Sequence, residues 1–388
     1  MNTKFFALVL ASLAVCSLAL ASEDLRPNGV NTECYRFEEY PRTEAPKGYK
    51  PVYLSHYGRH GSRTTTSKTE FADYAKVVDV LKEAQKQKLL TAAGDSLLSE
   101  CVAVMESTDG MIGALTRIGE AEQHKLAELL YSEYKPVFRN GPKYVRVQNS
   151  TVPRSIVSGE CFVQTLTSLQ SDLRFSFDTG DKIFAYIDNG PDKEHRATVT
   201  HLRDSLAALS VSDGVEFCKH VFRKPKKGLA LIGDPDEFQR LVWYVAREGA
   251  ATGVQADMFR HLPEDVVAKW WTDKVVDIYM NQCNSVEFGD RRMKRAEPLV
   301  KVMLEQARQA LECGTVAADL KFGHDYPLVA TAGYFGFDGV GGRYTLSDLP
   351  GAWADPMYVP FSTNLQMAFY RNDKNGDVLV KFVYNGKE

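Results

Sequence analysis

Three stretches of the chain share one pattern, in which a short strand-like run ends in a polar loop and a helical pattern follows. The strand-like runs are Pro51–Tyr57, which starts apolar, Lys143–Gln148, in which Val145 and Val147 alternate with the other residues, and Ala317–Phe322. Apolar residues then recur at helical spacing over 70–90, over 156–169, and from Pro327 to a stop near Gly333 or Gly336. Such strand–loop–helix units predict an α/β fold with a mostly parallel central sheet flanked by helices.

The remaining pattern adds helices and a hairpin. Helical spacing also runs over 115–134, where Thr116 is a good N-cap. Residues 176–227 are polar and predict loops. Further helices are expected from Asp234-Pro235 to Gly249, from Pro263 to Tyr279, and at Pro298, which opens or bends a helix ending at Glu312. Met367–Tyr370 and Val378–Tyr384 flank turn residues and predict a C-terminal hairpin.

These elements divide the chain into four expected parts. Residues 1–21 are a signal peptide and 22–180 the first part of the α/β core. Residues 181–316 form a mostly helical insert, or cap, and 317–388 complete the core.

The first residues have the composition of an export signal. Lys4 precedes an apolar run over 5–20, and Ala19-Leu20-Ala21 is a small-x-small cleavage site. We therefore expect a periplasmic or secreted protein. A lipid anchor at Cys16 is the alternative, although Val15 is bulky for the residue before a lipidated cysteine. No other stretch of the sequence is long and apolar enough to predict a stable membrane span.

Composition narrows the function classes. The net charge is −3, with 44% hydrophobic residues, which argues against a general nucleic-acid or membrane-surface role and requires any basic site to be local. Six cysteines remain after residue 21, which permits up to three disulfides in an exported chain, with free buried cysteines as the alternative. The sequence carries no signal for an oligomeric state.

The candidate chemistry lies in the loops that follow the three strands. The first loop carries Arg59, His60, Gly61 and Arg63, the second Arg154 at the start of a helix, and the third His324 with Asp325. Because the carboxyl ends of parallel strands share one edge of the sheet, these groups can meet in one pocket. Guanidiniums suit a tetrahedral phosphate dianion, a histidine can attack phosphorus, and a carboxyl group can protonate the leaving oxygen. The set predicts phosphoryl transfer without a metal or other cofactor.

These motifs resemble the histidine phosphatase superfamily, in the branch of histidine acid phosphatases, phytases and multiple inositol polyphosphate phosphatases. The similar segments follow the family's order: Arg59-His60-Gly61-Ser62-Arg63, then Leu115-Thr116 to Gly119 with Gln123-His124, then Arg154-Ser155 with Ser158-Gly159, then Gly323-His324-Asp325. The resemblance implies an α/β core with a helical insert. It also implies that His60 is the nucleophile, that Asp325 is the proton donor, and that phosphate is bound by Arg59, Arg63, Arg154 and His324.

The substrate stays open among phosphorylated small molecules. Multiple inositol polyphosphate phosphatases usually follow the second histidine with Ala-Glu, whereas Asp325 directly follows His324 here, as in acid phosphatases and many phytases. The segments Tyr57–Arg63 and Phe322–His324 look closer to the inositol-phosphatase side. A basic cluster, Arg223-Lys224-Pro225-Lys226-Lys227, is either a solvated face or a contact for extra phosphates.

Two other classes of protein, a metal-dependent phosphatase and a phosphate-binding protein, agree less well with the sequence. A metal-dependent phosphatase would use histidine and aspartate as ligands, but dense ligand motifs are missing. A phosphate-binding protein without turnover would keep the arginines, but here all the catalytic residue types are present. His124 lies on the apolar face of its predicted helix, which favours a core histidine over a catalytic one.

Overall fold

The computed structural model describes residues 31–388 except 109, 189–192, 208–211 and 354. The expected signal peptide and the alternative lipid anchor at Cys16 both lie outside the described residues.

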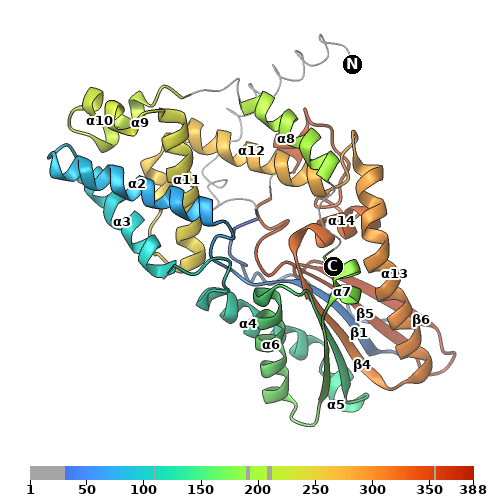
Figure 1. Cartoon of the computed structure of the whole chain (residues 1–388). Helices are drawn as coiled ribbons and strands as arrows, with labels where there is room; N and C mark the ends of the chain where they lie inside the picture. The colour runs from blue at the N-terminus through green and yellow to red at the C-terminus, as the bar shows by residue number, and fades with distance from the viewer. Residues whose placement is uncertain (1–30, 109, 189–192, 208–211, 354) are drawn as a thin grey trace.

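The core is one six-stranded sheet with the order β3-β2-β4-β1-β5-β6 (Figure 1). The strands are β1 (Tyr49–Arg59), β2 (Tyr144–Asn149), β3 (Arg174–Asp178), β4 (Val316–Gly323), β5 (Asn364–Asn372) and β6 (Val378–Tyr384). β3, β2, β4 and β1 are parallel to one another, and β5 and β6 form an antiparallel hairpin on β1. The mostly parallel α/β sheet and the C-terminal hairpin predicted from the sequence are therefore confirmed.

The helices surround this sheet and extend beyond it. They are α2 (Lys68–Lys86), α3 (Ala92–Thr108), α4 (Arg117–Glu133), α5 (Lys135–Asn140), α6 (Pro153–Leu169), α7 (Asp181–Ile187), α8 (Lys193–Ala207), α9 (Val215–Val221), α10 (Pro225–Ile232), α11 (Pro235–Thr252), η2 (Met258–His261), α12 (Glu264–Gln282), α13 (Gly289–Cys313), α14 (Asp325–Phe335) and α15 (Leu349–Ala352). Thr116 caps α4 as expected, with its side chain accepting from the Gly119 N–H.

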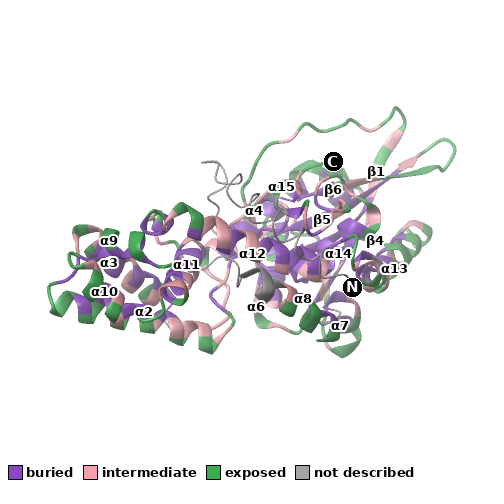
Figure 2. Ribbon diagram, turned by 90° about the horizontal axis from the view of Figure 1, so that it is seen from above, coloured by how far each residue is buried: buried purple, intermediate pink, exposed green. Residues whose placement is uncertain are grey.

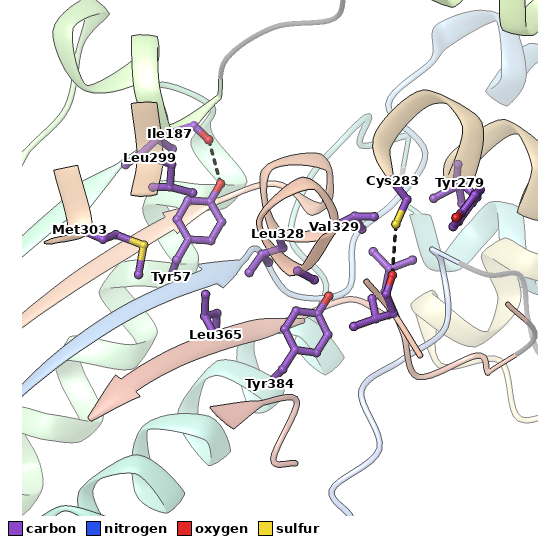
Figure 3. Packing of buried hydrophobic residues seen from close by; sticks show 14 of the residues in the cluster. Tyr57, Ile187, Tyr279, Cys283, Leu299, Met303, Leu328, Val329, Leu365 and Tyr384 are labelled. Carbon is purple, nitrogen blue, oxygen red and sulfur yellow. Dashed lines mark hydrogen bonds between the residues drawn. The ribbon is translucent and has the colours of Figure 1, made fainter. Parts of the chain in front are cut away.

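Each face of the sheet has its own hydrophobic layer, because successive side chains of a strand point to opposite faces. On one face, α4, α5 and α6 cover Val145, Val147 and Leu320. On the other face, α7, α13 and α14 cover Tyr57 (Figure 3). The Tyr57 hydroxyl also donates to the Ile187 carbonyl at 2.8 Å, which ties α7 to the central strand.

A third hydrophobic cluster lies away from the sheet and forms what we call the helical lobe. It joins α2 and α3 to α9, α10, α11, η2 and the start of α12, and Figure 2 shows α2, α3, α9 and α10 together beside the sheet region. We expected the helical part from residues 181–316 alone. In the structure, α2 and α3 come from before that range, while α13, inside the range, packs on the sheet. α2 and α3 belong to the lobe because their buried apolar faces pack in the same hydrophobic cluster as α9, α10 and α11.

Several local expectations were wrong. The stretch 176–227, expected as loops, contains α7, α8, α9 and the start of α10, and α3 is not predicted from the sequence. Gly249 lies inside α11, and Gly253 ends that helix in a left-handed conformation at φ +84°. α13 begins at Gly289 and contains Pro298, so this proline does not open the helix, and the alternative that it lies within one describes the structure.

The six cysteines of the described part are free thiols, namely Cys34, Cys101, Cys161, Cys218, Cys283 and Cys313. Among them, Cys283 donates from its sulfur to the Val340 carbonyl inside the core (Figure 3). The free-cysteine alternative therefore describes this structure, rather than the disulfides that the sequence permits.

Within the described ranges, no helix has the length and apolar character that crossing a bilayer needs.

Candidate active site

Strand register brings the three predicted loops to one edge of the sheet. Arg59, the last residue of β1, pairs with Gly323 at the end of β4. The next residue continues this contact, since the His60 N–H donates to the Gly323 carbonyl at 3.0 Å. The loop after β2 joins in the same way through Ser150, whose N–H donates to the Phe322 carbonyl at 2.9 Å. The loops that follow β1, β2 and β4 are therefore neighbours.

The turn after β1 depends on a close approach of two glycines. A Cβ on Gly61 would lie 2.4 Å from the Gly119 carbonyl oxygen, so no other residue fits without a shift of the backbone. The Gly61 N–H donates to the Ser158 hydroxyl at 3.1 Å. The turn is thus held by α4 on one side and α6 on the other, which explains why the weaker segments around Gly119 and Ser158 accompany the first motif.

A buried carboxylate fixes the same turn. Glu122 accepts from the Ser62 N–H at 2.9 Å, from the Ser62 hydroxyl at 2.7 Å and from the Ser362 hydroxyl at 2.7 Å. Its neighbour Gln123 donates to the Arg59 carbonyl at 3.2 Å. Burial raises the pKa of Glu122, although these hydrogen bonds oppose the rise. Two successive residues of α4 therefore set the path of the chain from Arg59 to Ser62.

The tautomer of His60 follows from its hydrogen bond. Its Nδ1 lies 2.9 Å from the Gly61 carbonyl, which can only accept, so Nδ1 carries the proton. Burial, and then the charges of Arg59 and Arg154, hold the pKa of His60 well below its ordinary value. The ring is therefore neutral, and its Nε2 has a free lone pair.

Arg59 and Arg63 share one aromatic support. Both guanidiniums lie over the ring of Phe361, at 4.6 Å and 5.6 Å from its centre. Arg59 also donates from Nη1 to the carbonyls of Val359 at 3.0 Å and Pro360 at 2.8 Å. These contacts leave little freedom for the guanidinium planes, as bidentate binding of an oxyanion requires.

The three arginines keep unused hydrogen-bonding capacity. The Nε–H groups of Arg59, Arg63 and Arg154 are buried and have no acceptor within the part of the chain that the structure describes. Burial, followed by Arg63 and Arg59, lowers the pKa of Arg154 to about 10, and Arg154 is still charged near neutral pH. Buried, charged donors without acceptors are suited to an anionic ligand.

Asp325 and His324 complete the set at the start of α14. The Asp325 Oδ2 lies 3.3 Å from Arg59 Nη2 and accepts from Asn31 Nδ2 at 2.9 Å. Burial raises the pKa of Asp325, but Arg59, Asn31 and His324 outweigh it and the pKa falls below its ordinary value. The ring of His324 lies 5.5 Å from that of His60, centre to centre.

His324 has two polar partners. Its Nε2 lies 3.0 Å from the Ser150 hydroxyl and 3.3 Å from Asp188 Oδ2. The structure thus brings all six predicted residues to one edge of the sheet: Arg59, His60, Arg63, Arg154, His324 and Asp325.

Several neighbours of these six residues are not predicted by any sequence motif. They are Asn31 in the segment before β1, residues 31–48, which we call the N-terminal arm, Glu122 on α4, Ser150 and Asp188 beside His324, and Phe361 under the arginines. Each acts through a contact across the fold that no local motif encodes. The strongest missed signal is the pair Glu122-Gln123, since buried polar residues on an apolar helix face need partners.

Other candidates are not brought to this edge. His124 Nδ1 lies 2.8 Å from the Thr165 hydroxyl between α4 and α6. The cluster 223–227 is largely exposed and borders α10, which lies at the end of the helical lobe away from the sheet (Figure 1).

No family model matches the chain, and no curated protein sequence matches it. Several solved structures, in contrast, are similar to the chain over most of its length. A multiple inositol polyphosphate phosphatase from Bifidobacterium longum, in complex with inositol hexasulfate, superposes with a TM-score of 0.71 at 15% identity, covering 94% of this chain and 92% of that one. A phytase from D. castellii gives a TM-score of 0.64 at 14% identity, covering 93% and 79%. The chain therefore has the fold of the inositol polyphosphate phosphatases and phytases, as the resemblance of its motifs implies.

Proposed function

We propose that this chain is a phosphomonoester hydrolase that works through a phosphohistidine at His60. The observation that carries the proposal is the neutral His60 ring, with its proton fixed on Nδ1 by the Gly61 carbonyl. A lone pair on Nε2, with the guanidiniums of Arg59, Arg154 and Arg63 close enough to lower the pKa of the ring, suits in-line attack on a bound phosphate.

In the first step, Nε2 of His60 forms a bond to phosphorus and the bond to the leaving oxygen breaks. The carboxyl group of Asp325 transfers its proton to that oxygen, so an alcohol departs and a carboxylate remains. In the second step, Asp325 takes a proton from water as the water oxygen attacks phosphorus. The P–N bond breaks, inorganic phosphate forms, and His60 is again a neutral ring.

The remaining groups stabilise the phosphoryl oxygens. Arg59, Arg63 and Arg154 supply charge that changes little between ground state and transition state, and their burial strengthens it. His324 binds the phosphate in this proposal, with Ser150 and Asp188 orienting its ring.

The proposal needs no metal ion, because the guanidiniums provide the charge that a metal otherwise would. Its support is the donor set: among the described residues, no group of three or more His, Cys, Asp or Glu side chains is placed to hold a metal ion. The rival metal-dependent phosphatase would require such a group.

Inositol polyphosphates are our first candidates for the substrate. The neighbour from Bifidobacterium longum is described in complex with inositol hexasulfate, a polyanionic ring of that kind. Simple phosphomonoesters are the second candidates, since Asp325 follows His324 directly, as in acid phosphatases and many phytases.

A panel of phosphomonoesters assayed across pH, with and without a strong chelator, tests the proposal. We expect phosphate release from phytate or from an aryl phosphate on the acid side of neutrality, unchanged by the chelator. Acid-quench labelling should trap a phosphoenzyme that is lost in His60→Ala. Phosphate binding without release would indicate the binding protein, and activity lost to the chelator and restored by zinc or magnesium would indicate the metal enzyme.

We also propose that the chain is exported to the periplasm or the medium after removal of residues 1–21. Sequencing the N-terminus of the mature protein tests this, with Ser22 expected first. A lipid-modified Cys16 would contradict it.

A further inference from the structure

Every hydrogen-bonding contact that the structure gives the Asp325 carboxyl comes from a donor. Oδ2 accepts from Asn31 Nδ2 at 2.9 Å and lies 3.3 Å from Arg59 Nη2. Oδ1 accepts from the N–H of Tyr326 at 3.0 Å. Such a shell favours the carboxylate, whereas the proposed first step needs the protonated acid. A neighbouring group must therefore be able to hydrogen-bond to Asp325 both as the carboxylate and as the protonated acid.

We infer that Asn31 is a positioning residue that orients the Asp325 carboxyl and sets its affinity for the proton. The inference rests on the proposed function, because it assigns Asn31 a part in the acid–base work of that reaction. It concerns how the proton is held, and it does not require that Asn31 touch the substrate.

An amide can pair with a carboxyl group in either protonation state. Its nitrogen donates to a carboxylate, and after a half-turn about its last bond its oxygen accepts from the protonated acid. The Asn31 Oδ1 is buried and has no partner within the described residues, so the acceptor is available. A lysine at this position would favour the carboxylate only, because it can donate but cannot accept and keeps its charge over the working pH range.

The arm that carries Asn31 is anchored residue by residue. The Thr32 hydroxyl accepts from Arg247 Nε at 3.0 Å, and the Glu33 carbonyl accepts from the Phe361 N–H at 2.8 Å. The Tyr35 N–H donates to Glu122 at 2.9 Å. The arm thus contacts α11, the loop that contains Phe361, and α4. These contacts hold Asn31 in place beside Asp325.

The arginines and tyrosines around Asp325 change little in charge over the acid range. The charged or titratable groups that face it are Arg59 and Tyr57 from β1, Arg63 from the first loop, Arg154 from α6, His324 beside it and Tyr384 from β6. The arginines stay charged and burial raises the pKa of both tyrosines. His324 is the same in wild type and in the Asn31 variants, so a difference between their Asp325 titrations can be traced to residue 31.

Two substitutions and a control test the inference. In Asn31→Ala the carboxylate loses a donor, so the pKa of Asp325 rises and the acid persists to higher pH. The falling limb of kcat/KM for an inositol phosphate should then move up by about one pH unit, a size typical of the loss of one hydrogen bond to a charged group. Asn31→Asp should move it further, because a second carboxylate would share the site. Arg36→Ala, on the same arm but paired with Glu33, should leave the limb in place.

An aryl phosphate separates a proton effect from a loss of structure. Its leaving group needs little protonation, so its profile should move much less in both variants. The pKa of Asp325, followed by carbon-13 NMR in the full chain, gives a readout that does not depend on turnover. If wild type hydrolyses no phosphomonoester, the proposed function fails while the NMR titration still tests Asn31. An Asp325 pKa that is the same in wild type, Asn31→Ala and Asn31→Asp overturns the inference.

Discussion

The edge of the sheet and the helical lobe meet at the candidate site but contribute to it very differently. The edge supplies all six predicted residues, and backbone pairing between β1, β2 and β4 fixes the loops that carry them. The lobe reaches the site mainly through α11. There Glu248 accepts from the Thr65 N–H at 2.6 Å. Burial lowers the pKa of Arg63, and the nearby charge of Arg247 adds to this effect.

This difference indicates that the sheet edge carries the catalytic groups and that the helical lobe contributes to substrate recognition. A site held by strand register is rigid and suits chemistry that needs exact placement of charge. A lobe built from helices of two distant segments can vary in shape and suits recognition of the rest of a substrate. Changes at the edge should therefore reduce kcat, and changes in the lobe should alter KM for large substrates or have no effect.

The largest expected effect is at His60. His60→Ala should reduce kcat by about 10⁴-fold or more, because it removes the group that bonds to phosphorus. His124→Ala, which loses a histidine whose Nδ1 lies beside the Thr165 hydroxyl on the outer helices, should keep near-normal activity. Steady-state kinetics with one ester compares the two. Comparable activity in both variants would remove His60 from the mechanism.

The next effect is at Asp325 and depends on the leaving group. Asp325→Asn should slow hydrolysis of an inositol phosphate by roughly 10²- to 10³-fold, as expected for the loss of a general acid. An aryl phosphate should be affected much less in the phosphorylation step. In wild type, kcat/KM should fall as pH rises through the pKa of Asp325. The neighbouring arginines and Asn31 lower that pKa in the free protein, and a bound phosphate should raise it again.

The control is phosphate binding, which Asp325→Asn should retain because the arginines are intact. Equal slowing of both substrates in the phosphorylation step would show that Asp325 orients His324 rather than donating a proton.

The same contrast explains what could be predicted from the sequence. The edge was predictable because each strand ends at a loop with charged residues, and parallel strands bring such loops together. Thus Arg59, Arg154 and His324 could be placed in one site although they lie far apart in the chain. What the sequence did not reveal are contacts that depend on side-chain placement across the fold, such as Phe361 under two guanidiniums.

The lobe was predicted less well for a physical reason. Short helices have little stability of their own and form because their apolar faces are buried. α9 is an example: Phe217 and Val221 are fully buried in the lobe's cluster, yet its seven residues are too few to give a clear helical period. The pattern over 176–227 therefore predicts loops where the structure has the short helices α7 and α9. α8 has fifteen residues, but its sequence is mostly polar and also favours a loop.

Arg247 should show the lobe's part in recognition. Arg247→Ala should raise KM for an inositol polyphosphate by about 10-fold, a typical value for the loss of one charge-assisted hydrogen bond. The fall in kcat should be smaller than this rise in KM, and it would report the loosening of the arm that Arg247 anchors through Thr32. KM for an aryl phosphate, which has no second phosphate, should change much less. Measuring both constants for both substrates separates binding from chemistry.

Arg240→Ala is the matched control on the same helix. Arg240 lies over the ring of Tyr244, as Arg247 does, but it pairs with Glu237 rather than with the arm. Its loss should leave both KM values near those of wild type. An equal rise in KM for both substrates in Arg247→Ala would indicate a disturbed Arg63 rather than a second binding contact.

The smallest effect is expected at the basic cluster on the lobe. Lys224, Lys226 and Lys227 are exposed and lie at the start of α10, away from the sheet (Figure 1). At physiological salt, charges separated by more than about 8 Å are largely screened. Changing the three lysines to glutamine should therefore alter KM for an inositol polyphosphate and for an aryl phosphate by less than about twofold each. Arg223 is left unchanged, because its Nε donates to the Leu90 carbonyl and holds the α2–α3 connection to the α9–α10 connection.

The same triple variant should be slightly more stable than wild type. α10 has no side-chain cap and no acidic residue in its first turn, and two of these lysines place positive charge at the positive end of the helix dipole. Removing them should raise stability by roughly 0.3 to 1 kcal/mol, seen as a small rise in Tm at low salt that fades as salt is added. If instead KM for the polyphosphate rose far more than KM for the aryl ester, the end of the lobe would contact substrate, and recognition would extend well beyond α11.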